Sequence, residues 1–175
     1  SQSINLYNQL AKEKLFSKSI NFDLKRIKLV LQKLNHPEKK LKNVINIIGS
    51  DGKYSLLTSL RYFIEANKQK TSAYISPSLK DIRERFWMGN NFLSYVEIKK
   101  AIKTIKKQKI NLTIFEVLTV IFILSAAKKN NDACFEFVLS KNGFRTYVFI
   151  DSMYKSYKCV HVHMNSGNMN FEPPA

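Results

Sequence analysis

Residues 49–55 read Gly-Ser-Asp-Gly-Lys-Tyr-Ser and carry the clearest chemical pattern in the sequence. Glycines let backbone N–H groups close around phosphate oxygens, a following helix N-terminus adds positive dipole, and one lysine can reach the outer phosphates. The spacing is shorter than the common G-x-x-x-x-G-K-[ST] pattern. Two interpretations follow: a phosphate cradle with Lys53 at the β/γ phosphates of a nucleotide, or a glycine turn with a surface lysine.

A second candidate segment, residues 74–86, follows the next predicted strand along the chain. Ser76 stands at the C-terminal end of that strand, the edge at which open α/β sheets bind ligands. Its hydroxyl can ligate Mg²⁺, a cation that prefers oxygen ligands, while Arg83 and Arg85 could meet an anionic substrate. The alternative is an ordinary loop with solvated charges.

Acidic residues and histidines supply the remaining candidates. Glu136 lies in a predicted apolar strand, where a carboxylate is costly unless it is paired or bound to metal; the alternative is an exposed residue outside a strand. Glu116 begins a predicted buried helix, whose dipole stabilises an acid in its first turn. His161 and His163 occupy alternate positions in a possible strand. They are interpreted either as structural or exposed residues or as metal ligands.

Apolar periodicity predicts the elements that must position these residues. Helices are predicted at 4–16, 24–34, 53–67, 95–107 and 115–128, and strands at 42–48, 71–75 and 134–139. Asp23 is expected to cap the second helix and Thr113 the last one. Strands that alternate with helices predict an α/β fold, a three-layer sandwich around a mostly parallel sheet.

Composition excludes several classes of protein. The 175 residues suffice for one domain with a sizeable core, and no apolar run approaches the roughly 18 residues of a transmembrane helix, so no membrane partner is expected. The formal net charge is +16, but only five of the 29 basic residues are arginine, the usual reader of phosphates and bases. A lysine-rich surface is therefore favoured over a nucleic-acid partner.

Cys134 and Cys159 are too few for a disulfide framework and lack zinc spacing, which favours a reducing cytoplasm. The chain begins Ser-Gln-Ser, so a fragment or trimmed chain is expected. Both cysteines, two of three histidines and three of four methionines follow residue 131. Residues 140–175 are therefore expected to be a divergent tail, out of frame or joined from elsewhere, beside a domain at 1–139.

In this order the motifs resemble the dihydrofolate synthase/folylpolyglutamate synthase family of the Mur ligase superfamily. The family's G-T-N-G-K-G-S loop is similar to residues 49–55, and its S-P-H-L with a later E-R is similar to Ser76-Pro77-Ser78-Leu79 and Glu84-Arg85. Its L-T-x-F-E matches residues 112–116, and its E-V-G-L-G-G resembles residues 136–139 without the glycines. The match covers about residues 20–139.

The resemblance implies a truncated, P-loop-type Mur ligase central domain and an ATP-dependent acid–amino-acid ligase. Such enzymes use Mg-ATP to phosphorylate a carboxylate on a pteroate or folate, and the amine of L-glutamate then attacks the acyl phosphate. The implied ATP-binding residues are Gly49, Ser50, Asp51, Gly52, Lys53, Tyr54 and Ser55, with Lys53 catalytic. The implied Mg²⁺ ligands are Ser76, Glu136 and His163, and the implied substrate-binding residues are Pro77, Leu79, Arg83 and Arg85.

Departures from the family pattern bear on activity. Tyr54 replaces a small glycine, Asp51 adds a negative charge near phosphates, and the family's chains are more than twice as long. We therefore predict a cytoplasmic monomer that binds ATP and Mg²⁺ but does not join dihydropteroate or folate to L-glutamate as this piece. The rivals are a Mur ligase with a cell-wall precursor substrate, a degenerate nucleotide-binding module and a basic RNA-binding protein.

Overall fold

The computed structural model describes residues 4–6, 8, 10, 16–17, 24–49, 52–76, 78, 80–137, 158–165 and 168–170. For 16–17, 48–49, 133–137, 158–165 and 168–170 the description is confined to the backbone.

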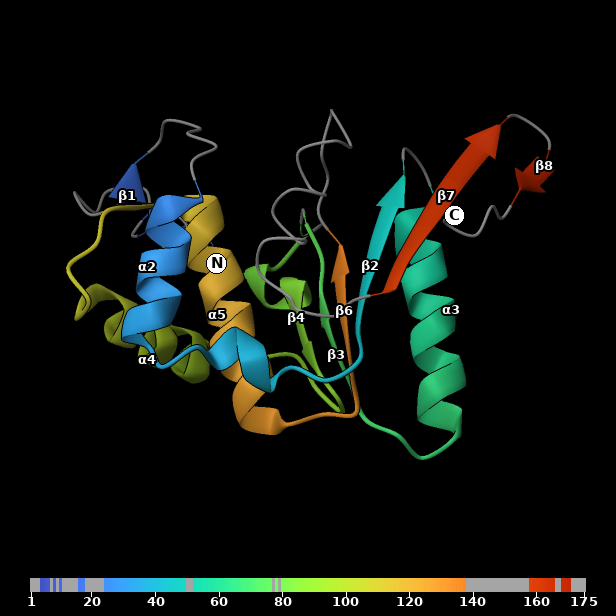
Figure 1. Ribbon diagram of the computed structural model, residues 1–175, viewed down its shortest axis with the longest axis horizontal. Coiled ribbons are helices and arrows are strands. Elements are labelled where there is room, and N and C mark those ends of the chain that lie inside the picture. Colours follow the sequence, from blue (N-terminus) through green and yellow to red (C-terminus); the bar gives the residue numbers. More distant parts are fainter. Residues whose placement is uncertain are drawn as a thin grey trace.

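A six-stranded sheet forms the centre of the molecule, in the order β4-β3-β6-β2-β7-β8 (Figure 1). Its strands are β4 (Phe86–Met88), β3 (Thr71–Tyr74), β6 (Ala133–Phe137), β2 (Val44–Gly49), β7 (Lys158–Asn165) and β8 (Asn168–Asn170). The four central strands pair in parallel, and β4 and β8 join the edges antiparallel. The predicted strands correspond to β2, β3 and β6, whereas β4 was not predicted.

Strand β7 lies directly beside β2, the strand that leads into the glycine loop. The register runs from Ile45 opposite Lys158 to Gly49 opposite Val162. The possible strand around His161 and His163 is therefore confirmed. Part of the expected tail pairs with the centre of the sheet, and the division of the chain at 139/140 stays a prediction.

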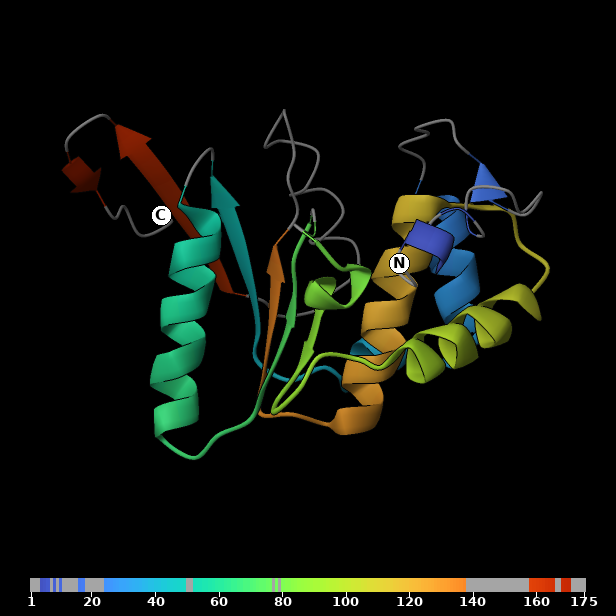
Figure 2. The same cartoon turned by 180° about the vertical axis from the view of Figure 1, so that it is seen from behind.

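Helices lie on both sides of this sheet (Figures 1 and 2). Helix α3 (Lys53–Ala66) lies on one side; α2 (Lys25–Lys33), α4 (Tyr95–Lys106) and α5 (Ile114–Lys129) lie together on the other. The short elements are η1 (Pro37–Lys40), η2 (Ile82–Arg85) and a pair of two-residue strands, β1 (Phe16–Ser17) and β5 (Leu112–Thr113). The prediction of a mixed helix and strand fold is confirmed.

The two sides bury separate apolar clusters because successive side chains of a strand point to opposite faces. Ile47 and Ala73 pack with Leu57 of α3, whereas the adjoining Tyr74 joins the larger cluster around α5. In that cluster Tyr74 stacks on Phe122 at 5.3 Å between ring centroids. Helix α5 is buried almost all round, as its predominantly apolar sequence predicts.

Side-chain caps fix where two of the helices begin. Thr113 Oγ1 accepts from the backbone N–H of Glu116 at 3.2 Å, and the Glu116 carboxylate accepts from the N–H of Thr113 at 2.6 Å. This capping box confirms the Thr113 cap and gives Glu116 a structural role at the helix N-terminus. Ser94 and Glu97 form a second box at α4, which was not predicted.

The first elements differ in part from the prediction. The N-cap of helix α2 is Leu24, which provides no side-chain cap, and the first helical bond runs from the N–H of Lys28 to the carbonyl of Leu24. Asp23, the predicted cap, lies outside the described residues. Of the helix predicted at 4–16, the described residues up to 10 are helical, but Phe16 belongs to β1 and pairs with Leu112.

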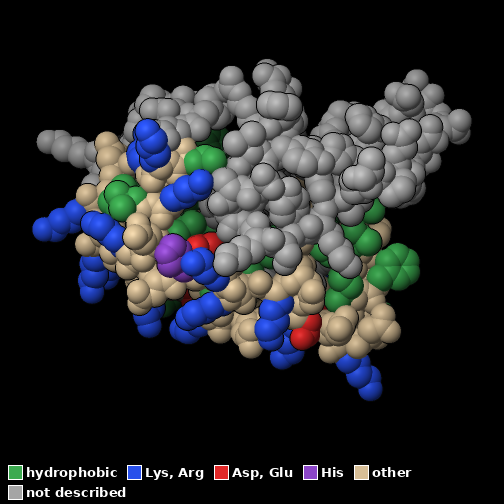
Figure 3. All heavy atoms as spheres, in the orientation of Figure 1, with side chains coloured by type: hydrophobic (Ala, Val, Ile, Leu, Met, Phe, Trp, Pro, Cys, Tyr) green, Lys and Arg blue, Asp and Glu red, His purple; other side chains and the backbone are tan. Residues whose placement is uncertain are grey.

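Lysines are scattered over the described part of the face that Figure 3 shows. Figure 3 shows Lys and Arg side chains spread over the described part of the visible face, with few acidic groups between them. This spread favours the lysine-rich surface over a localised nucleic-acid-binding face. Among the described residues, no helix is long and apolar enough to cross a membrane.

Candidate functional site

The glycine loop connects β2 to α3 at the carboxyl edge of the sheet. Gly49 is the last residue of β2, and Gly52 is the N-cap of α3 with φ 72°. Glycine adopts this left-handed conformation at the lowest cost, so Gly52 suits the turn into the helix. The N–H of Leu56 donates to the carbonyl of Gly52 at 2.9 Å and closes the first turn. Ser50 and Asp51 lie outside the described residues.

Lys53, the first residue of α3, is only 4% exposed. Lysine is almost never buried to this extent unless its ammonium group has a partner. A cation at a helix N-terminus is also repelled by the positive end of the helix dipole, and an anion bound there would offset this repulsion. Lys53 is therefore not the exposed surface lysine that the alternative interpretation expects.

The next two residues face outward. Tyr54 is 55% exposed, and Ser55 is also exposed. The bulky ring that replaces the family's glycine thus stands in solvent, so its size does not by itself obstruct the loop. The exposure of Ser55 gives no support to a phosphate contact, and its ATP-binding role stays a prediction.

Ser76 and Arg85 form a buried pair beyond the end of β3. Ser76 is 6% exposed and Arg85 5% exposed, and Arg85 Nη1 donates to Ser76 Oγ at 2.7 Å. The N–H of Ile75 donates to the carbonyl of Arg85 at 3.1 Å, which holds the two backbone segments together. Because a guanidinium repels a second cation, Ser76 can ligate Mg²⁺ only with its remaining lone pair or after Arg85 moves.

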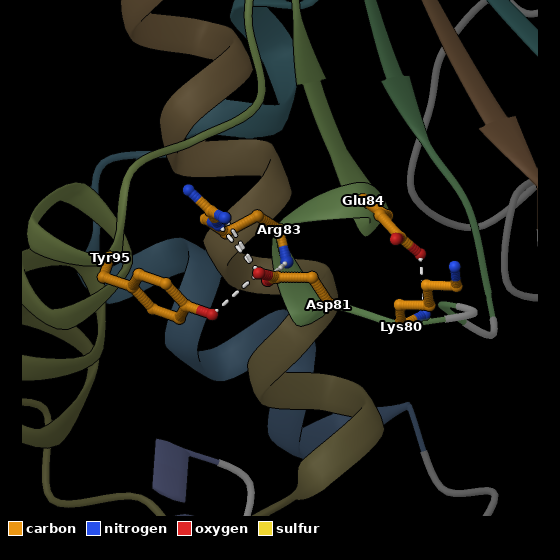
Figure 4. A network of polar contacts seen from close by, with 5 residues as sticks. All are labelled: Lys80, Asp81, Arg83, Glu84 and Tyr95. Atoms are coloured by element: carbon orange, nitrogen blue, oxygen red, sulfur yellow. Dashed lines mark hydrogen bonds and ion pairs between the residues drawn. The ribbon is translucent and has the colours of Figure 1, made fainter. Parts of the chain in front are cut away.

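Arg83, two residues earlier, is held by a network that joins η2 to α4 (Figure 4). Its Nη2 donates to Asp81 Oδ2 at 2.9 Å, and its guanidinium lies 4.7 Å from the centroid of the Tyr95 ring. Tyr95 Oη donates to the same oxygen of Asp81 at 2.9 Å. Arg83 would have to exchange these contacts to bind a substrate anion.

The protonation of Asp81 reflects this network. Burial by itself would raise the pKa of Asp81, but hydrogen bonds from the Arg83 side chain and backbone and from Tyr95 outweigh it and lower the pKa. The hydrogen bond to Asp81 likewise raises the pKa of Arg83. A neighbouring hydrogen bond from the N–H of Lys80 to Glu84 Oε2, 3.1 Å, completes the segment in Figure 4. Pro77 and Leu79 lie outside the described residues.

Backbone register places Glu136 and His163 relative to the loop. Glu136 in β6 is the register partner of Asn46 in β2 and of Tyr74 in β3. His163 in β7 directly follows Val162, the register partner of Gly49. Both residues therefore lie on strands that neighbour β2, and their roles as metal ligands stay predictions.

The described residues contain no group of three or more His, Cys, Asp or Glu side chains that could hold a metal ion by themselves. Mg²⁺ is ordinarily bound through one or two carboxylates together with substrate phosphates and water. A cation at this edge would accordingly depend on nucleotide oxygens as well as protein ligands.

Asn46 is a residue of interest that the motif analysis missed. It lies in the middle of β2, is 0% exposed, and neither Nδ2 nor Oδ1 has a hydrogen-bond partner among the described residues. A polar residue inside the run Val-Ile-Asn-Ile-Ile was the available signal. A completely buried amide in the strand that enters a glycine loop calls for a physical explanation.

Solved structures show what this fold is similar to. E. coli FolC in complex with DHPP and ADP matches with a TM-score of 0.76 and 22% identity over 92% of this chain and 39% of its own. The Yersinia pestis bifunctional folylpolyglutamate synthase/dihydrofolate synthase complexed with AMPPNP and Mn ion matches with a TM-score of 0.70 and 23% identity. This match covers 78% of this chain and 33% of the Yersinia chain. Thermotoga maritima folylpolyglutamate synthase matches with a TM-score of 0.74 and 20% identity over 94% of this chain and 45% of its own.

The chain spans less than half the length of each of these solved chains. No protein-family model and no curated protein matches the sequence. At these identities the likeness establishes the fold, and it agrees with the family that the motifs resemble. The chain folds like part of a folylpolyglutamate synthase/dihydrofolate synthase.

Proposed function

We propose that this chain is the nucleotide-binding part of an ATP-dependent folate-type amide ligase. The observation that carries the proposal is the turn at Gly52 with the buried Lys53 behind it. This turn occurs in a fold similar to enzymes that were solved with ADP and with AMPPNP. The combination of glycine turn, helix N-terminus and buried lysine suits a polyphosphate.

The proposed reaction has two steps. The γ-phosphoryl group of ATP is transferred to a carboxylate oxygen of a pteroate or folate, which gives an acyl phosphate and ADP. The amine of L-glutamate then attacks the acyl carbon, the amide bond forms, and phosphate leaves. The protein contributes mainly position and charge neutralisation.

Lys53 and the N-terminus of α3 neutralise phosphate charge in this proposal. Ser50 and Asp51 belong to the same loop, and the negative charge of Asp51 weakens nucleotide binding unless a cation offsets it. Mg²⁺ supplies charge neutralisation at the β- and γ-phosphate oxygens when it is bound. The proposed ligands Ser76, Glu136 and His163 offer hydroxyl, carboxylate and imidazole donors.

Arg85 is the better placed of the two candidate arginines for the substrate. It is buried beside Ser76, whereas Arg83 is exposed and paired with Asp81. An anion that approaches Ser76 meets the Arg85 guanidinium and can replace its hydrogen bond to the serine. We assign Arg85 to the substrate carboxylate, with Pro77 and Leu79 in the same segment.

Calorimetric titration of Mg-ATP against the chain tests the nucleotide site. We expect saturable binding that Lys53→Ala weakens by roughly 100-fold, because truncation leaves phosphate charge without its buried partner. Lys99→Ala, an exposed lysine on α4, is the matched control and leaves the affinity unchanged. Equal affinities for Lys53→Ala and the unsubstituted chain would contradict the proposal.

A degenerate module without ligase activity is the second candidate, supported by Asp51 and Tyr54 in the glycine loop and by the glycines that are missing after Glu136. A coupled ADP-release assay with dihydropteroate and L-glutamate addresses turnover. We expect nucleotide binding without product from this piece, and robust amide formation would show that it is a complete catalyst. Turnover with a cell-wall precursor would identify the Mur ligase alternative.

A further inference from the structure

We infer that Asn46 holds a water molecule of the hydration shell of the bound cation, beneath the glycine loop. This inference rests on the proposed function, since it requires the cation that accompanies the nucleotide. Asn46, which lies in β2, is thereby added to the residues proposed to bind the hydrated cation.

Packing alone does not account for Asn46. Its side chain is 0% exposed, and both amide atoms are buried without a hydrogen-bond partner among the described residues. A leucine has nearly the same shape and would avoid the desolvation of two polar atoms. An asparagine here is therefore costly to the fold unless something polar binds to it.

A second buried asparagine shows how this molecule ordinarily treats such an amide. Asn131, which is 6% exposed, donates from Nδ2 to the carbonyl of Thr71 at 3.0 Å and to Ser72 Oγ at 2.9 Å. Asn131 joins the segment before β6 to β3 and has a clear structural function. Asn46 has no such contacts within the described part of the chain, so its function differs.

The position of Asn46 points to the cation. It lies three residues before Gly49 in β2, and its register partner in β6 is Glu136, a proposed ligand. Its partner on the other side, in β7, is Cys159. Asn46 thus lies in the strand that leads to the loop, beside the backbone position of the proposed ligand Glu136.

The amide has the right chemistry for a cation-bound water. Mg²⁺ usually retains several waters in proteins, and buried waters typically bond to polar groups that the protein leaves unsatisfied. A water polarised by a cation is a strong donor, and Oδ1 of Asn46 can accept from it.

The experiment measures ATP affinity with and without Mg²⁺ in the full chain, for Asn46→Leu and for Asn46→Val, a second variant that suits a strand. We expect each substitution to reduce the Mg²⁺-dependent gain in affinity by roughly five- to tenfold, about the effect of one hydrogen bond. Affinity for metal-free ATP stays unchanged, and the midpoint of thermal unfolding is unchanged or higher.

Mn²⁺ titration followed by electron paramagnetic resonance gives a readout besides nucleotide affinity: the substituted chains leave more free Mn²⁺ in the presence of ATP. The control Asn131→Ala lowers the unfolding midpoint and leaves the Mg²⁺ effect intact. If both Asn46 variants keep the full Mg²⁺ effect, Asn46 is structural and the inference is wrong, although the nucleotide site stands. If the unsubstituted chain binds no Mg-ATP, the proposed function fails and this inference with it.

Discussion

Two neighbouring regions at the carboxyl edge of the sheet satisfy their polar groups in different ways. In the segment after β3, side chains bond to one another: Ser76 to Arg85, and Asp81 to both Arg83 and Tyr95. In the region from β2 to α3, the conformation depends on backbone geometry at Gly52, and the buried Asn46 lacks a partner among the described residues.

This difference separates a segment that is held in place without nucleotide from a region that a nucleotide would complete. A segment whose polar groups bond to one another is held in place before any ligand arrives. A region that buries an amide without a hydrogen-bond partner among the described residues bears a cost that a bound ligand can offset. Substitutions at Asp81, Arg83 and Arg85 should therefore alter stability more than nucleotide affinity, whereas substitutions around the loop should alter mainly nucleotide affinity.

The largest expected stability effect in the segment after β3 is at Arg85. Arg85→Ala removes a buried hydrogen bond to Ser76 and leaves a cavity, so we expect a loss of about 2–3 kcal/mol in the free energy of unfolding. Urea denaturation measures it. Arg83→Ala is the matched control two residues away, and its exposed ion pair should contribute far less. Equal losses of unfolding free energy in the two variants would show that burial does not set how much each arginine stabilises this segment.

A smaller effect concerns the pH dependence of stability. Because the folded pKa of Asp81 is lowered below its unfolded value, its contribution is present above the unfolded pKa of about 4 and is lost as the pH falls through the folded pKa. Asp81→Asn should therefore flatten the acid limb of a stability–pH curve below about pH 4 and lower the stability near neutral pH. An acid limb identical to that of the unsubstituted chain would show that the network does not stabilise the charged form.

The smallest expected effect is at Tyr54. Since this ring is exposed, Tyr54→Gly, which restores the family's residue, should change the dissociation constant of Mg-ATP by less than about threefold. Glycine in the first helical turn should also cost up to roughly 1 kcal/mol of stability. A large gain in affinity would mean that the ring obstructs the loop, and the loop would then be less open to a ligand than its geometry indicates.

The sequence predicts the features that depend on local pattern. Residues 45–48 form most of β2, the helix after Gly52 begins at Lys53, and Thr113 caps α5. Each of these follows from apolar periodicity, glycine position or a capping residue within a few positions of the element. The ordered motifs also identified the family whose fold the chain shares.

Contacts between distant residues were not predictable in this way. The bond between Ser76 and Arg85 depends on how the backbone folds back over nine residues, and the engagement of Arg83 depends on Tyr95 from another element. The burial of Asn46 depends on two strands, β6 and β7, that follow it by roughly ninety or more residues. Charge and residue type alone made Arg83 and Arg85 look equivalent, whereas burial separates them.

Hydrogen–deuterium exchange with and without Mg-ATP tests the central claim most directly, because it measures both regions in one experiment. Saturating Mg-ATP should slow amide exchange at residues 52–57, at the N-terminus of α3, and leave residues 80–86 nearly unchanged, and Lys53→Ala should abolish this protection. Unchanged exchange at 52–57, or protection confined to 80–86, would contradict the assignment of the glycine loop as the nucleotide site.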